Sequence, residues 1–269
     1  MVLKKITRIT VQQKNKNRYN IFLADEYAFS VDEAILIEFG LRKGLELDEA
    51  AINKIVQKEK LYQFYTQSIN YLSYRMRTKK EVYDYLKKKE VEPEYIDEII
   101  DRLTKEKLLD DREFAEAFVR TRINTSTKGP KVIAQELREK GVSAKIVADV
   151  LELYTTEKQF DKVYKIMEKK LRQSSKHAFR KRLEQIQVNL MQKGFSREII
   201  QEVAVNFSDQ KDADAEWEAL VFQGEKLLRK YQNKFSGFEL RNKLTEGLYR
   251  KGFSFDLIQR FIQESLEQE

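Results

Sequence analysis

One short phrase occurs four times along this chain, and it constrains the fold more than any other feature. The sequence reads KGVSAKIV from Lys140, KGFSREII from Lys193 and KGFSFDLI from Lys251, and a diverged copy, KEVEPEYI, begins at Lys89. Successive copies begin 51, 53 and 58 residues apart. A phrase that returns at such intervals indicates tandem structural repeats rather than one continuous globular core.

Apolar residues stand at four fixed distances from the lysine of each phrase. In every copy the positions seven and three residues before the lysine are apolar, and so are the positions seven and ten residues after it. These helical spacings predict two helices in each copy, with these four positions facing the core. The four sets are Val82, Ile133, Ile186 and Leu244; Leu86, Leu137, Leu190 and Leu248; Ile96, Val147, Ile200 and Ile258; and Ile99, Val150, Val203 and Phe261.

The phrase itself has the residues of a helix end followed by a helix start. Its lysine suits the negative end of the helix dipole. Gly141, Gly194 and Gly252 can adopt the left-handed conformation that closes a helix. A serine two residues later can cap the next helix with its hydroxyl. These serines are Ser143, Ser196 and Ser254.

The first copy departs from this pattern. Glu90 replaces the glycine, and Pro93 stands near the first position of the next helix. We therefore expect this turn to differ in geometry from the other three.

Separate start signals precede the helix that leads into the phrase. Thr78 with Glu81, and Ser236 with Glu239, have the spacing of a capping box. Pro130 suits a first helical turn, where a missing amide hydrogen is not needed.

We expect four tandem units of three helices each. A further helix ahead of each phrase is indicated by QFYTQSINYLSYR, DREFAEAFVRTRI, FDKVYKIMEKKL and AEWEALVFQGEKLLRKY. Units of this length bury little apolar surface alone, so neighbours must stack. The expected fold is mainly α, an elongated, curved array of four three-helix repeats with a small β-containing N-terminal region. The expected repeats are residues 61–107, 108–155, 156–208 and 209–269.

Residues 1–60 follow a different pattern. KKITRITVQQ and RYNIFLADEYAFS alternate apolar and polar residues on either side of KNKN, which predicts a β-hairpin. VDEAILIEFG and LDEAAINKIVQKEKLY have the pattern of short helices. The region is either a small β-containing cap or a separate docking element, and the pattern does not decide between them.

Basic residues are concentrated in the third repeat. The formal net charge is +7, and ten Lys or Arg residues from Lys162 to Lys193 face only Glu168 and Glu184. Such a run is either a solvated helix face or a surface that binds a polyanion, and the sequence leaves both interpretations open.

Composition argues against most catalytic chemistry. The chain has no Cys and a single histidine, His177, so disulfides, thiolate nucleophiles and Cys-ligated zinc are excluded. His177 lies in a basic segment, which favours an exposed residue over a catalytic base. We expect no enzyme activity, no metal and no cofactor. No apolar run is long enough for a membrane span and no signal peptide is recognisable, so we expect a cytoplasmic protein.

Residues 71–151 resemble the RecX family of bacterial RecA regulators, in its long Gram-positive form. The matching stretches are YLSYRMRTKKEVYDYLKKK, LLDDREFAEAFVRTR and KGPKVIAQELREKGVSAKIVADVL, in this order. The resemblance implies a helical-repeat protein that binds RecA and its nucleoprotein filament. It also implies suppression of RecA ATPase and strand exchange in recombination and DNA repair, and binding of single- or double-stranded DNA by some members.

Basic side chains are the expected contacts if the array lies along a RecA filament. Tyr71 and Tyr74 could stack on bases or on a partner, or could instead pack between helices. The candidate cations are Arg75, Arg77, Lys79, Lys80, Lys87, Lys88, Arg120, Arg122, Lys128, Lys131, Lys165, Lys169, Lys170, Lys176, Arg180, Lys181 and Arg182.

Two other functions stay open at this point. A DNA-binding protein that acts independently of RecA would explain the basic run, although no unit groups polar base-reading residues at the start of a helix. A protein-only scaffold would make the charge incidental. We expect a monomer in either case.

Overall fold

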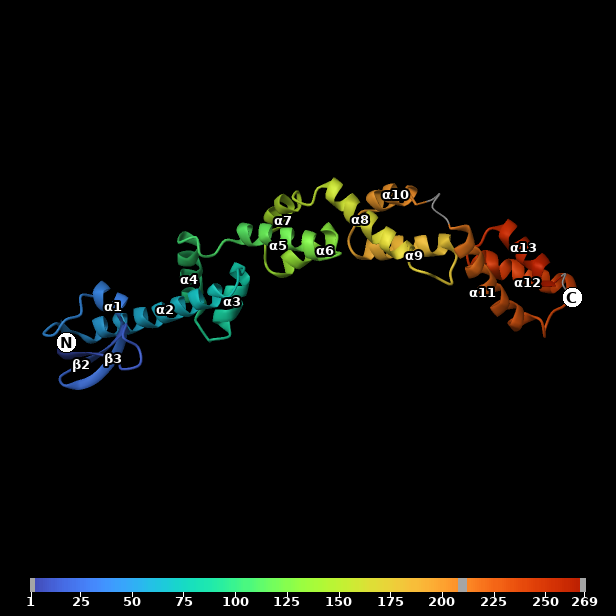
Figure 1. Cartoon of the computed structure of the whole chain (residues 1–269). Helices are drawn as coiled ribbons and strands as arrows, with labels where there is room; N and C mark the ends of the chain where they lie inside the picture. Colours follow the sequence, from blue (N-terminus) through green and yellow to red (C-terminus); the bar gives the residue numbers. More distant parts are fainter. Residues whose placement is uncertain (1–2, 208–211, 267–269) are drawn as a thin grey trace. The chain divides into compact units, whose positions relative to one another are not determined.

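The computed structural model describes residues 3–207 and 212–266 of the chain. These residues contain four strands and thirteen helices (Figure 1). The predicted class is confirmed, because a small N-terminal sheet is followed by helices that group in threes.

The four strands form one antiparallel sheet. They are β1 (Lys4–Val11), β2 (Arg18–Leu23), β3 (Glu26–Asp32) and β4 (Glu46–Leu47), in the order β3-β2-β1-β4. Strands β1 and β2 pair across the KNKN segment. The stretch RYNIFLADEYAFS supplies both β2 and β3, because the chain reverses at Ala24 and Asp25, whose φ angles are 51° and 66°.

Two helices cover one face of this sheet. Helix α1 (Glu33–Glu38) and the first half of α2 (Glu49–Ser73) contribute Ile35 and Ile55 to a core that also contains Ile6, Ile21 and Phe29. The opposite face of the sheet carries polar and aromatic side chains.

Glu59 joins α2 to the sheet. This side chain is almost fully buried, forms an ion pair with Arg18 at 2.9 Å and accepts a hydrogen bond from the amide of Asp32 at 2.7 Å. Helix α2 then continues unbroken to Ser73. The expected division at residue 60 therefore falls inside one 25-residue helix, and the repeat boundaries remain a prediction.

The helices after the sheet form four repeats, named here by their helices. Repeat 1 comprises the second half of α2 with α3 and α4, repeat 2 comprises α5–α7, repeat 3 comprises α8–α10, and repeat 4 comprises α11–α13. Their bounds are α3 (Lys79–Lys87), α4 (Pro93–Lys105), α5 (Asp111–Thr125), α6 (Pro130–Glu139), α7 (Ala144–Leu151), α8 (Thr156–Leu171), α9 (Phe179–Gln192), α10 (Arg197–Val205), α11 (Ala213–Tyr231), α12 (Gly237–Arg250) and α13 (Phe255–Leu266).

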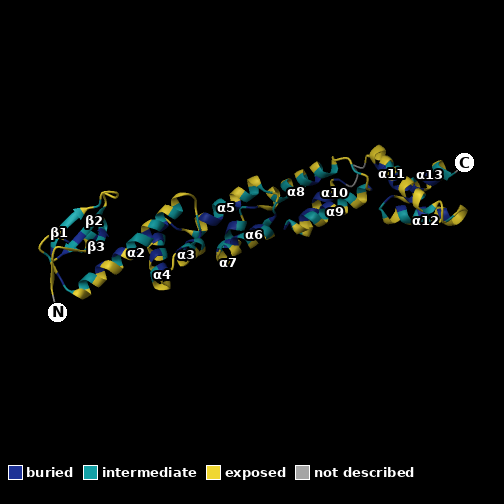
Figure 2. Cartoon of the chain, turned by 90° about the horizontal axis from the view of Figure 1, so that it is seen from below, coloured by how far each residue is buried: buried dark blue, intermediate teal, exposed yellow. Residues whose placement is uncertain are grey.

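The sixteen predicted core positions are all buried, and none exceeds 7% exposure. Figure 2 shows the same pattern, with buried residues along the inner sides of the helices and exposed residues along the outer sides. The residue after each phrase glycine, such as Phe195 or Phe253, is also buried.

The turn inside the phrase is left-handed in every repeat. Gly141, Gly194 and Gly252 have φ angles of 85°, 91° and 94°. Glu90 has a φ of 60°, and the amide of Val91 bonds to the carbonyl of Leu86, five residues back, as Phe195 and Phe253 do in their turns. The expectation of a different first turn is therefore wrong. Because Val91 must reach the core, Glu90 adopts the same left-handed conformation as the glycines of the other turns.

The predicted caps are confirmed in part. Thr78 and Glu81 form a complete capping box, and Ser143 and Ser196 cap α7 and α10. The capping box at Ser236 is wrong, because its side chain makes no capping hydrogen bond. The next residue, Gly237, is left-handed with a φ of 52°, which changes the entry of the chain into α12.

The described residues divide into two compact units. One contains residues up to Phe114 together with Lys140–Val142, and the other contains Ala115–Glu139 and the residues after Val142.

Candidate protein and nucleic-acid interface

The phrase turn and the first helix of one repeat contact the start of the middle helix of the preceding repeat. We call the contact between repeats 1 and 2 joint 1, that between repeats 2 and 3 joint 2, and that between repeats 3 and 4 joint 3. In joint 1 the hydroxyl of Thr78 donates to the carbonyl of Lys140 at 2.7 Å. The amide of Lys79 donates to the carboxylate of Asp111 at 2.8 Å. The start of α3 is thus capped from the next repeat, because its first amides lack partners within the helix.

Glu81 is the charged centre of joint 1. Its carboxylate binds Arg75 at 3.0 Å and Lys140 at 3.0 Å. Burial raises the pKa of Glu81, but hydrogen bonds from Arg75 and Lys140 outweigh it and lower the pKa to about 2. Arg75 is therefore held by an ion pair within the protein.

Joint 2 is a backbone-to-backbone contact. The amide of Gly129 donates to the carbonyl of Lys193 at 2.7 Å, and the amide of Lys131 donates to the carbonyl of Gly194 at 3.2 Å. A Cβ on Gly129 would lie 2.5 Å from backbone atoms of Gly194 and Phe195. Glycine is required here because the two chains approach so closely.

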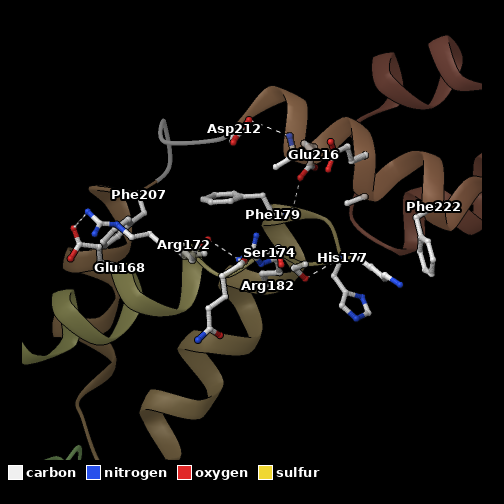
Figure 3. Close-up of a pocket in the computed structure, with 17 residues that line it drawn as sticks. Glu168, Arg172, Ser174, His177, Phe179, Arg182, Phe207, Asp212, Glu216 and Phe222 are labelled. Carbon is white, nitrogen blue, oxygen red and sulfur yellow. Dashed lines mark hydrogen bonds and ion pairs between the residues drawn. The ribbon is translucent and has the colours of Figure 1, made fainter.

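Joint 3 relies on side chains. The amide of Phe179 donates to the buried carboxylate of Glu216 at 2.8 Å, and Gln223 donates to the carbonyl of Lys176 at 2.7 Å. A hollow of about 960 Å³ lies beside this joint, lined by residues of repeats 3 and 4 (Figure 3). Figure 3 shows Phe179 and Glu216 toward its middle, with His177 and Phe222 at one side.

Three cations donate hydrogen bonds to carbonyls at the C-terminal ends of α2, α5 and α8, the first helices of repeats 1, 2 and 3. Arg77 donates to the carbonyl of Tyr71 at 2.9 Å, and Lys162 donates to the carbonyls of Ile123 and Ser126. Arg182 donates to three carbonyls at the end of α8, including that of Leu171 at 2.7 Å. Cations suit this position because the carbonyls there are unpaired and carry the negative end of the helix dipole. Burial lowers the pKa of Lys162 and of Arg182.

Two further candidates share one carboxylate. Arg122 pairs with Glu136 at 2.9 Å, and Lys128 pairs with the same carboxylate. Burial raises the pKa of Glu136, but Lys128 and Arg122 lower it more, so the net shift is downward. These cations bridge the end of α5 to α6, which is a structural role.

The other candidate cations lie at the surface. Arg120 pairs with Glu116, and both Arg180 and Lys181 pair with Glu184, in exposed pairs that stabilise little. Lys170 donates to Asn189, Lys176 lies 4.1 Å from the ring of Phe222, and Lys80 packs beside Gly141. Lys79 is partly buried. Among the candidates, five exposed lysines show no ion pair or side-chain hydrogen bond within the described residues, namely Lys87, Lys88, Lys131, Lys165 and Lys169.

The two candidate tyrosines differ in exposure. Tyr71 lies between the guanidinium of Arg77, 3.5 Å above its ring, and the ring of Tyr85, stacked at 4.0 Å. Both of its faces are occupied by the protein. Tyr74, in contrast, is 85% exposed and free to meet a partner.

Several residues important to the joints are not marked as such by the sequence. Lys162, Asp111 and Glu216 look like ordinary members of charge runs or first-turn acids, yet each satisfies backbone groups of a neighbouring repeat. Their positions relative to the phrase are a usable signal, since an acid in the first turn of α5 or α11 lies near the preceding middle helix once the repeats stack.

The described residues show no group of three or more His, Cys, Asp or Glu side chains able to hold a metal ion. His177 is exposed on the loop between α8 and α9. None of the described helices has the length and apolarity of a membrane span.

Family models match most of the chain. The model described as the regulatory protein RecX N-terminal domain matches residues 4–48. The models of the first and second RecX three-helix domains match residues 65–103 and 110–151. The model of the third three-helix domain matches twice, at 157–204 and 214–262.

Full-length relatives and solved structures carry the same name. The chain is 57% identical over 272 residues to "Regulatory protein RecX" of Oceanobacillus iheyensis, covering 99% of this chain and 100% of the relative. It is 43% identical to the protein of that name from Bacillus cytotoxicus, covering 98% of each. A crystal structure of regulatory protein RecX, 38% identical, aligns with a TM-score of 0.69 over 75% of this chain and 99% of the other. RecX from Lactobacillus salivarius, 40% identical, aligns with a TM-score of 0.53 over 54% of this chain and 95% of the other.

Proposed function

This chain belongs to the RecX family, and from that premise we propose that it is a regulatory protein that binds RecA and RecA–DNA filaments. Binding inhibits RecA ATPase and strand exchange in recombination and DNA repair. The protein acts by occupying a surface of the filament, spanning more than one RecA protomer, and performs no chemistry itself. We propose that it does so as a monomer in the cytoplasm.

The observation that carries this proposal is the unpaired cationic surface of the middle repeats. Lys165 and Lys169 lie one turn apart on the exposed side of α8, and Lys131 projects from the start of α6. A lysine that makes no ion pair in its own protein can bind phosphates or an acidic protein surface without first giving up an intramolecular carboxylate. Lys87 and Lys88 of repeat 1 are likewise exposed and without an ion pair within the described residues.

The remaining candidates divide by the partners they already have. Arg75, Arg77, Arg122, Lys128 and Arg182 stabilise joints and helix ends, and we propose that their loss acts through folding. The exposed members of surface pairs can exchange an intramolecular carboxylate for a partner at little cost, because such pairs are weak. Those members are Arg120, Arg180 and Lys181.

The division of the chain expected from the sequence also remains our proposal. It assigns residues 1–60 to an N-terminal element and 61–107, 108–155, 156–208 and 209–269 to the four repeats. Each joint would then link one proposed repeat to the next.

The direct test is RecA ATP hydrolysis on single-stranded DNA, titrated with this protein from far below one copy per RecA upward. Inhibition at low ratios supports a block at filament ends, and inhibition only near stoichiometry supports occupancy along the filament. Lys165→Glu with Lys169→Glu is expected to raise the half-inhibitory concentration by about tenfold. A matched control is Lys226→Glu with Lys234→Glu, two exposed lysines of repeat 4. An unchanged ATPase rate at all ratios would contradict the proposal.

Direct DNA binding without RecA is the second candidate function, favoured by the same unpaired lysines. If about six phosphates are contacted, affinity should fall roughly a thousandfold between 50 and 200 mM salt. Salt-sensitive binding to naked DNA together with an unaffected RecA would promote this function over the first.

A further inference from the structure

The outer face of the N-terminal sheet presents side chains in cross-strand rows. Arg8 of β1 is opposite Phe22 of β2, which is opposite Tyr27 of β3. The next row contains Thr10, Asn20 and Ser30. The apolar core lies on the other face, where α1 and α2 pack. Within the described residues, no helix covers these rows.

The first row is an aromatic and cationic surface. The guanidinium of Arg8 lies 4.0 Å from the centre of the Phe22 ring, and Phe22 meets Tyr27 edge to face at 6.0 Å. Tyr27 is 60% exposed. The register shifts between β2 and β3 after Ile21, and this bulge brings Tyr27 rather than Ala28 opposite Phe22.

The second row is held in place by hydrogen bonds. Gln12 donates to Asn20 at 2.9 Å and to Ser30 at 3.1 Å, and Ser30 donates to Asn20 at 2.8 Å. The hydroxyl of Tyr27 lies 2.9 Å from that of Ser30, so the tyrosine ring is tied to this network. A surface whose rotamers are already fixed loses little entropy when a ligand binds.

The charge of β1, the β1–β2 loop and β2 is one-sided. Residues 1–24 contain six basic side chains and no acid, in a chain whose net charge is +7. Arg18 is paired with Glu59, and the other five are exposed, namely Lys4, Lys5, Arg8, Lys14 and Lys16. The acids follow this stretch: Asp25 and Glu26 directly precede Tyr27, and nine acids in all stand from Asp25 to Glu59, which balances the composition of residues 1–60 as a whole.

We propose that this face binds single-stranded DNA, with a base stacked on Tyr27 beside Phe22 and the backbone following the basic residues of β1 and the β1–β2 loop. Exposed aromatic rings on a sheet need an unstacked base, which a duplex does not offer, and nearby cations neutralise the phosphates. Asn20 of the second row and Gln12, which donates to it, provide polar groups for base edges. This site goes beyond the proposed RecA regulation and is tested without RecA.

The experiment measures binding of a fluorescent dT20 oligonucleotide to the full chain by anisotropy at several salt concentrations. Tyr27→Ala is expected to weaken binding about tenfold with an unchanged salt slope, since it removes stacking. Lys14→Glu with Lys16→Glu should lower the slope by about 0.7 for each phosphate that the protein no longer neutralises. Tyr249→Ala and Lys54→Glu, at exposed positions elsewhere, are the matched controls and should bind as wild type.

A second measurement locates the bound strand directly. An oligonucleotide carrying 5-iododeoxyuridine is cross-linked by light to the wild-type chain, and the labelled peptide is identified by mass spectrometry. Cross-links in β2 or β3 are expected. Circular dichroism of each variant, compared with wild type, shows that the sheet is still folded.

Several results would overturn the site. These are wild-type binding by Tyr27→Ala and the lysine variants, cross-links only in the repeats, or tighter binding of duplex or of rU20 than of dT20. A variant that loses RecA inhibition but keeps dT20 binding would assign the face to protein instead. Loss of dT20 binding with normal RecA inhibition would support this site and leave the proposed function intact.

Discussion

Joints 2 and 3 use the same turn sequence, KGFS, but fit their receiving helices differently. In joint 2 the backbone of Gly194 lies against that of Gly129. A Cβ added to Gly129 would lie 2.5 Å from backbone atoms of Gly194. In joint 3 a Cβ on Gly252 would have 3.6 Å to the nearest atoms of Ala178 and Lys181. The difference comes from the receiving helix, which begins with Gly-Pro in joint 2 and Ala-Phe in joint 3. The same turn therefore makes a close-fitting joint where the receiving residue has no side chain.

Gly129→Ala should have the largest effect, and it tests the difference in fit between joints 2 and 3. The methyl group would overlap backbone atoms that cannot move without separating repeats 2 and 3, so we expect about 3 kcal/mol of destabilisation. Gly252→Ala should cost only about 1–2 kcal/mol, from its left-handed φ of 94°. Urea denaturation of the two variants measures the difference. A loss for Gly129→Ala no larger than that for Gly252→Ala would contradict the close fit of joint 2.

Joint 1, unlike the backbone contact of joint 2, has an ion-paired carboxylate at its centre, that of Glu81. Glu81→Gln tests how much this charge stabilises the protein. The folded-state pKa of Glu81, about 2, lies below its ordinary value, so its stabilisation is complete above about pH 4.5 and is lost as pH falls toward 2. We expect the variant to be about 2 kcal/mol less stable at pH 7, a value reduced for solvent screening. The variant should also show a flatter decline between pH 4.5 and 2. Parallel pH profiles for variant and wild type would contradict this role.

Tyr154 tests packing next to joint 2. Its ring contacts that of Phe195 and is 2% exposed, and its hydroxyl has no hydrogen-bond partner within the described residues. Burial raises its pKa to about 12. Tyr154→Phe should therefore stabilise the protein by about 1 kcal/mol, because an unsatisfied buried hydroxyl is removed. A destabilised variant in thermal unfolding would show that the hydroxyl has a partner after all.

The smallest expected effect concerns the turn of repeat 1. Glu90 adopts the left-handed conformation that glycine adopts in the other repeats. Glu90→Gly should stabilise by about 0.5 kcal/mol, since relief of backbone strain is partly offset by a more flexible unfolded chain. Glu90→Ala, which keeps the strain, is the control in the same thermal melts. A glycine variant no more stable than the alanine variant would exclude strain at this turn.

Local sequence signals were sufficient to predict which residues form the cores of the repeats. The sixteen apolar positions were predicted from spacing alone, because a helix buries every third or fourth residue whatever its neighbours are. The phrase glycines were predictable for a similar reason, since closing a helix in the left-handed conformation favours glycine within a few residues of sequence.

The candidate interface was less predictable. Arg182 and Lys169 look equivalent in the sequence, yet Arg182 donates to carbonyls at the end of α8 and Lys169 shows no partner within the described residues. Sequence periodicity says which face of a helix is polar. It does not say which polar residue meets a helix end from another part of the chain.

The sequence by itself determined the repeat, its core and the left-handed turns at its glycines, because these depend on residues close together along one or two helices. The tertiary structure alone decided how each turn meets the preceding repeat, which cations remain available to a partner, and that Arg8, Phe22 and Tyr27 share a row on the sheet. Those features depend on strand register and on contacts between residues far apart in the sequence, such as Thr78 and Lys140, whose geometry no local pattern encodes.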